Sequence, residues 1–161
     1  MNSKIKKIVR LSLIAAIYVV LTIVNPFSYN AIQFRISEIL MLLCFFRKDY
    51  SIALIIGCLI SNLFSPYMLY DIIFGTAATI LACICMMYSK NMFISITYPI
   101  IFNSILVSLE LHLFFELPFF INCLYVFIGE TVVMIIGLLI FYKLKSNNHF
   151  MELIDANQNV K

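Results

Sequence analysis

Five carboxylates lie within or beside long apolar stretches of this sequence: Glu38, Asp71, Glu110, Glu116 and Glu130. An ionisable group inside an apolar membrane segment is costly, so it usually faces the interior of a helix bundle and marks a ligand or ion path. The alternative is a solvated position at the level of the lipid headgroups. That alternative suits Glu116, which stands in a proline-containing loop, better than it suits Glu110 or Glu130.

Helical spacing brings some of these acids close to other polar groups. Asn103 and Glu110 are seven residues apart, which places them two turns apart on one helix face. Arg35 and Glu38 are three residues apart, so on a helix they are close enough to pair with each other. Asn62 needs a polar partner whether it binds a ligand or holds helices together. A binding role and a structural role both stay open for these residues.

Signatures of catalysis are missing from the sequence. It contains two histidines and no HExxH pattern, nucleophile elbow or Gly-rich phosphate loop. The five cysteines form no CxxC pair, and we interpret them as small apolar fillers. We therefore expect no enzyme activity, no metal site and no cofactor. Because the chain has no ATP-binding loop, its energy must come from an ion gradient or a partner protein.

The amino-acid composition indicates what surrounds the helices that carry these polar groups. The chain has 161 residues, of which 63% are hydrophobic and 12% charged, and its mean hydropathy is +1.03. A soluble domain carries about 25% charged residues, and a small domain leaves much of its surface exposed to water. We therefore predict an all-α integral membrane protein. Its basic residues are scattered, so nucleic-acid binding is not expected.

Six apolar segments follow one another along the chain, and each is long enough for a whole or shortened membrane helix. They span residues 6–25, 33–46, 50–64, 71–88, 92–114 and 119–143. With the N-terminus inside, ten of the eleven Lys and Arg residues fall on the inner side and only Arg35 falls outside. This bias follows the positive-inside rule. We predict six transmembrane helices, both termini in the cytoplasm, and a polar cytoplasmic tail over 146–161 that frays or lies at the surface.

Three stretches carry a specific resemblance. They are Ile32–Glu38 (IQFRISE), residues 57–79 with GCLISNLFSP and DIIFGTAAT, and residues 117–130 with LPF, LYV and GE. In this order they resemble the QueT family of queuosine-precursor transporters, and the resemblance runs from about residue 8 to 143. It implies a multi-pass cell-membrane protein, the substrate-binding S component of an energy-coupling factor (ECF) transporter, with residues 1–145 as one substrate-binding bundle.

The resemblance also implies partners. An S component docks on a transmembrane coupling subunit that carries two cytoplasmic ATPases. The docking signature is a pair of small residues four apart on the first helix, which here corresponds to Ser12 and Ala16. Serine stands where the usual motif has alanine. Because serine is also small, another helix can still approach closely.

The ligands that the resemblance implies are 7-deazaguanines with an aminomethyl or a cyano arm. Their guanine edge presents adjacent N–H donors, which a carboxylate accepts in a two-pronged contact. The expected site residues are Phe34, Arg35, Glu38, Asn62, Asp71, Asn103, Glu110, Tyr125 and Glu130. The sequence does not decide which precursor binds or which carboxylate reads which edge. A small ion-coupled transporter that uses Glu130, or a membrane-embedded enzyme acting on lipid, is the alternative.

Overall fold

A computed structural model describes residues 3–29 and 33–155, and all the regular secondary structure in these ranges is helical. The elements are α1 (Ser3–Val24), the 3₁₀ helix η1 (Ile36–Leu42), α2 (Leu43–Phe46), α3 (Tyr50–Asn62), α4 (Met68–Tyr88), α5 (Met92–Ser95), α6 (Thr97–Phe115), α7 (Phe119–Leu144) and α8 (Asn148–Leu153). The prediction of an all-α chain is confirmed for these residues.

Four helical stretches are long and apolar enough to cross a membrane: Lys4–Val24, Met68–Tyr88, Met92–Phe115 and Phe119–Leu144. The other two predicted segments are shorter apolar helices, over Ile36–Phe46 and Tyr50–Asn62. A straight span needs about 20 apolar residues. The six apolar segments are therefore all helical, while six complete membrane crossings stay a prediction.

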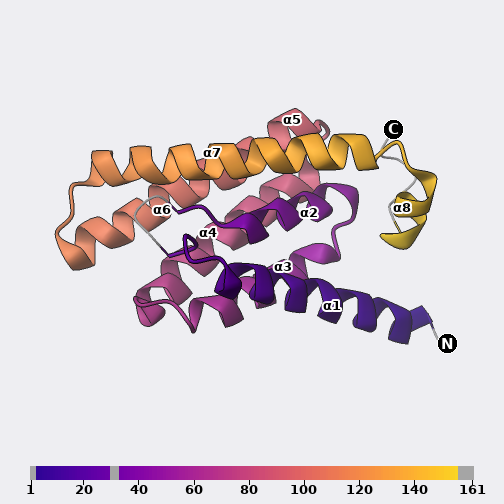
Figure 1. Ribbon diagram of the computed structural model, residues 1–161, viewed down its shortest axis with the longest axis horizontal. Helices are drawn as coiled ribbons and strands as arrows, with labels where there is room; N and C mark the ends of the chain where they lie inside the picture. The colour runs from indigo at the N-terminus through magenta and orange to yellow at the C-terminus, as the bar shows by residue number, and fades with distance from the viewer. Residues whose placement is uncertain (1–2, 30–32, 156–161) are drawn as a thin grey trace.

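The six segments close into a ring. Contacts join α1 to α3, α3 to α4, α4 to α6 and α6 to α7, and η1 contacts both α7 and α1. In Figure 1 the long helices run along the long axis of the molecule, with α1 and α7 on opposite sides. The N-terminus and α8 lie at one end, which we call the terminal end, and the α3–α4 and α6–α7 turns lie at the other, the pocket end (Figure 1).

Close packing of α1 on α3 fixes the position of a buried tyrosine. A Cβ added at Gly57 of α3 would lie 3.0 Å from the Cβ of Tyr18 and 3.2 Å from the carbonyl oxygen of Ala15. Any side chain at this position would therefore push α1 outwards. With glycine there, Tyr18 is completely buried and reaches the centre of the bundle.

The α6–α7 turn at the pocket end has a defined geometry. Glu116 ends α6 in the left-handed region, with φ of 56°. Pro118 then precedes α7 with extended backbone, a position that its fixed φ suits. Leu117 between them donates its N–H to the carbonyl of Leu111, so the turn folds back over the end of α6.

The terminal end is closed by α8. Ile154 is 5% exposed, and its carbonyl accepts a hydrogen bond of 2.9 Å from the Tyr50 hydroxyl. The Phe150 ring lies against those of Phe46 and Phe141, at centroid distances of 6.5 and 5.9 Å. No residue of α8 is buried, so this part of the tail forms a helix at the surface, and its partly buried Phe150 and Met151 pack against the bundle. Residues 156–161 lie outside the described residues.

Candidate functional site

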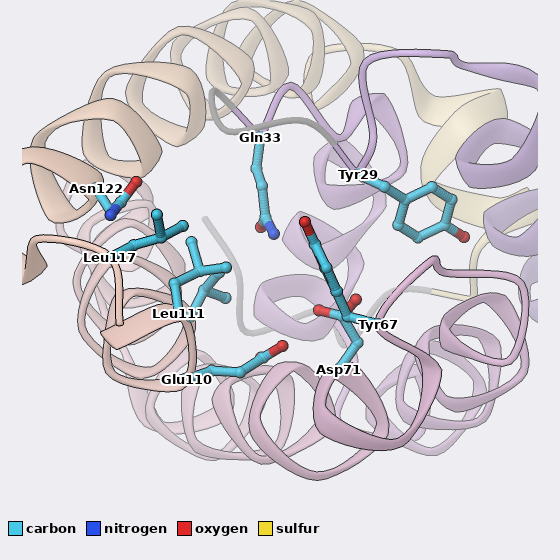
Figure 2. A pocket seen from close by; sticks show the side chains of 9 residues that line it. Tyr29, Gln33, Tyr67, Asp71, Glu110, Leu111, Leu117 and Asn122 are labelled. Carbon is cyan, nitrogen blue, oxygen red and sulfur yellow. The ribbon is translucent and has the colours of Figure 1, made fainter. Parts of the chain in front are cut away.

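A pocket opens between the helices at the pocket end of the bundle. The pocket and its mouth hold about 440 Å³ of empty space. Figure 2 shows side chains from several helices pointing towards its centre. The lining residues are Tyr29, Gln33, Tyr67, Asp71, Val107, Glu110, Leu111, Leu117 and Asn122.

Arg35 and Asn62 form the most extensively hydrogen-bonded part of the site. Arg35 is 2% exposed, and its guanidinium donates a hydrogen bond of 2.5 Å to the Asn62 side-chain oxygen. The Asn62 amide nitrogen donates in turn to the backbone carbonyl of Asp71 at 2.8 Å. A Cβ at Gly75 would lie 3.0 Å from that nitrogen, so the glycine leaves room for the amide. Asn62 thus connects the segment before η1 to the start of α4.

Arg35 and Glu38 do not pair with each other. Among the ion pairs of the described residues none joins them, and the Glu38 carboxylate accepts a hydrogen bond of 2.7 Å from the Tyr18 hydroxyl. Arg35 precedes η1 with extended backbone, φ −89° and ψ 92°. The spacing of three residues therefore does not place the two side chains on one helix face, and the predicted structural pairing does not form.

A second group of polar side chains is completely enclosed by the helices. The Asn103 amide donates a hydrogen bond of 3.1 Å to one carboxylate oxygen of Glu130 and also lies beside Glu38. These three residues are between 0 and 2% exposed. None of them is among the residues that line the pocket, so they lie behind its wall.

Glu110 has a different environment from the other acids. It is 1% exposed, lines the pocket, and neither of its carboxylate oxygens has a hydrogen-bond partner among the described residues. Asp71, which also lines the pocket, accepts a hydrogen bond from the Ser65 hydroxyl. Because Asn103 and Glu110 are both buried on α6, the prediction that they share a face is confirmed.

Two predicted residues lie apart from the pocket. Tyr125 is 40% exposed on the outer surface of α7. Phe34 is half-buried, and its backbone carbonyl accepts a hydrogen bond from Asn25. Neither side chain is among those that line the pocket.

Of the lining residues, only Asp71 and Glu110 were expected from the sequence. The residues that were not expected are Tyr29, Gln33, Tyr67, Val107, Leu111, Leu117 and Asn122. Gln33 belongs to the IQFRISE stretch, and this membership was the feature of the sequence that could have marked it as a site residue. Nothing in the helical periodicity marks the two tyrosines, because both lie between helices.

The candidate docking residues lie on the surface. Ser12 and Ala16 are both exposed on α1, between the exposed apolar side chains of Leu13 and Ile17. The most apolar stretch of α1 is 11% buried, compared with 39–50% for the other three long helices. Packing within this chain therefore does not account for the two small residues.

The part of the chain described here contains no group of three or more His, Cys, Asp or Glu side chains that could hold a metal ion. The pocket is lined by carboxylates, amides, tyrosines and apolar side chains, and the buried Arg35 is not among its lining residues.

Comparison with known proteins identifies the family of this chain. The model of the QueT transporter family matches residues 8–146. A queuosine precursor transporter, QueT, of Lactococcus lactis subsp. cremoris (strain MG1363) is 34% identical over 162 residues, which cover 89% of this chain and 94% of that protein. No solved structure gives a significant match. The match extends over all the long apolar helices, and the chain belongs to the QueT transporter family.

Proposed function

We propose that this chain is the substrate-binding subunit of an ECF-type importer that takes up a 7-deazaguanine queuosine precursor, bearing either an aminomethyl or a cyano arm. The family and the name of the Lactococcus relative support the class of substrate. The observation that carries the proposal is the pocket itself, in which the buried Glu110 has no protein partner. Buried polar groups are normally hydrogen-bonded, so an unpaired carboxylate in a pocket favours a ligand that supplies the donors.

The remaining polar groups suit a guanine-like ring. Adjacent N–H donors on the ring match a carboxylate, and amides such as Gln33 and Asn122 offer a donor to its carbonyl. The rings of Tyr29 and Tyr67 and the side chain of Leu111 provide flat or apolar surfaces for its faces. A mixed lining of apolar, aromatic and a few polar side chains is typical of sites for small organic ligands.

Six spans in the cell membrane, with both termini in the cytoplasm, are part of the proposal. The two short segments are supported by their burial, since Ser37, Glu38, Met41 and Leu42 of η1 are enclosed by neighbouring helices. Irregular or short helices are tolerated at membrane depth where protein shields them from lipid. The excess of basic residues on the terminal-end side supports the orientation.

Partners complete the proposed function. A transmembrane coupling subunit would contact the exposed face of α1 at Ser12 and Ala16, and two cytoplasmic ATPases would supply the energy. In lipid, helix association depends on close packing and not on the release of water, which is why small residues matter at such contacts. The exposure of both residues supports this role.

Replacing Ala16 with Trp tests the docking surface. The large side chain would fill the exposed face of α1 without touching the pocket. We expect the isolated variant to bind a 7-deazaguanine with normal affinity while co-purification of the ATPases and cellular uptake fall sharply. Ser12→Ala, the matched control, should behave like the wild type because it restores the usual small residue. Full complex formation by a well-folded Ala16→Trp protein would contradict the docking role.

An ion-coupled transporter is the second candidate. Glu130 favours it, since this acid is completely buried and one of its oxygens has no partner among the described residues. Uptake by cells that lack any coupling module, abolished by an ionophore, would support this candidate over the first.

A further inference from the structure

We infer that the site discriminates between the two precursors, and that Glu110 binds the protonated amine of the aminomethyl form, which is preferred over the cyano form. This inference rests on the proposed function, since it chooses between the ligands proposed there. Four observations on the described residues support it.

The first observation is the balance of charge. Four acids of the site are buried, each at most 4% exposed: Glu38, Asp71, Glu110 and Glu130. The buried base of the site is Arg35, whose guanidinium already donates to Asn62. A buried carboxylate without a counter-charge is costly. A ligand that brings a positive charge therefore matches the site better than a neutral one.

The second observation is the surplus of acceptors. Among the described side chains that line the pocket, three buried oxygens lack a hydrogen-bond partner: Gln33 Oε1 and both carboxylate oxygens of Glu110. Among the described nitrogen donors of the site, Nε of Arg35 also lacks a hydrogen-bond partner. A ligand with several N–H donors satisfies such a site, and an ammonium group carries three.

The third observation separates Glu110 from the other acids. Glu38 accepts from Tyr18, Asp71 from Ser65, and Glu130 from Asn103, whereas neither oxygen of Glu110 has a partner.

The fourth observation is the direction of the Glu110 side chain. Figure 2 shows its carboxylate pointing towards the open centre of the pocket, with Asp71 on the same side and Gln33 opposite. An ammonium group near Glu110 would also face Asp71.

The cyano arm has the opposite chemistry. Its nitrogen accepts hydrogen bonds and donates none, so beside Glu110 it would leave both carboxylate oxygens unpaired. Val107, Leu111 and Leu117, which also line the pocket, have apolar side chains that offer no hydrogen-bond donor in its place. Leaving a buried charged group unsatisfied costs more than forming a bond gains. The structure therefore favours the amine in two ways. Glu110 attracts its positive charge, and the nitrile would leave the carboxylate of Glu110 unpaired.

The test is a calorimetric titration of the purified protein in detergent micelles with each precursor at neutral pH. We expect the wild type to bind the aminomethyl compound about 10–100-fold more tightly than the cyano compound, the range for a charge-assisted hydrogen bond. Glu110→Gln should bring this ratio close to one, mainly by weakening the amine. Glu116→Gln, which changes an exposed carboxylate at the same end of the bundle, is the matched control and should keep the wild-type ratio.

The wild type alone gives a second measurement if the Glu110 variant does not fold. The 7-methyl analogue has an arm of similar size with neither charge nor donor, so it should bind at least about 10-fold more weakly than the amine. Equal binding of the three compounds, or tighter binding of the nitrile, would overturn the inference and leave the proposed function standing. An unchanged ratio in a folded Glu110→Gln protein would overturn the assignment to Glu110. Binding of none of them would overturn the proposed function and the inference with it.

Discussion

The carboxylates at the two ends of the molecule differ in their pairing and in their exposure to solvent. At the terminal end the carboxylates have basic partners: Lys7 and Arg47 contact Asp49 at 2.9 and 2.8 Å, and Arg10 and Arg47 contact Asp155. These side chains are 22–58% exposed. At the pocket end four acids and one arginine are buried, and most of the acids retain an unpaired oxygen. The acids at the terminal end are paired and partly exposed to solvent, whereas those at the pocket end are buried and incompletely hydrogen-bonded.

This difference supports the proposal that the pocket-end cluster is the one that binds a ligand. The ion pairs of the terminal end join α1, the α2–α3 loop and the segment after α8, so they hold parts of the fold together. The pocket end carries a cost in stability that the fold alone does not require. Both ends contain charged residues. They differ in how many of their carboxylate oxygens have a hydrogen-bond or ion-pair partner.

The largest expected effect comes from removing one arginine at each end. Arg35→Met would leave buried acids without their base and should lower the free energy of unfolding by about 3–5 kcal/mol. Arg47→Met removes an arginine with more ion-pair contacts, but a partly exposed one, and should cost about 1 kcal/mol or less. Denaturant unfolding in micelles, followed by far-UV circular dichroism, measures both. Equal losses, or a larger loss for Arg47→Met, would show that the two clusters do not differ as described.

Much of the fold follows from local features of the sequence. Apolar length and breaks such as Asn25-Pro26 and Arg47–Asp49 separate the helices where the structure does. Helical periodicity correctly places Asn103 and Glu110 together because both residues belong to one regular helix. These features depend only on residues near each other in the chain.

The rest of the site depends on contacts between segments. Tyr18 and Glu38 are 20 residues apart, and they meet because Gly57 lets α1 approach α3 closely. The spacing of Arg35 and Glu38 is misleading because Arg35 lies in extended backbone before η1. No periodicity contains this information, so the partners of the buried acids could not be assigned before the packing was known.

The smallest expected effect is a pH dependence at the terminal end. The pKa of Asp49 is lowered, first by its hydrogen bond from Lys7 and also by the one from Arg47. Because the folded-state pKa lies below the ordinary value of about 3.9, this carboxylate stabilises the fold above that value. The contribution is lost as the pH falls through the folded-state pKa. Asp49→Asn should therefore lower the unfolding midpoint slightly at about pH 7 and not at about pH 2.

Glu152→Gln is the control for this effect, since it removes an exposed carboxylate of α8. It should leave the pH dependence of the midpoint unchanged. A difference between Asp49→Asn and the wild type that grows as the pH falls would contradict the sign derived for Asp49.

Binding of a 7-deazaguanine by the double variant Glu110→Gln and Glu130→Gln tests the pocket end most directly. The Glu110 substitution should weaken binding by about 1–3 kcal/mol, the range for a hydrogen bond to a charged group, and Glu130, which does not line the pocket, should contribute less. The unfolding midpoint should not fall, because the wild-type acids are buried without full partners. Titration calorimetry of the purified wild type and double variant should therefore show a large loss of affinity in a stable protein. A double variant that binds the ligand as tightly as the wild type would contradict the binding site described here.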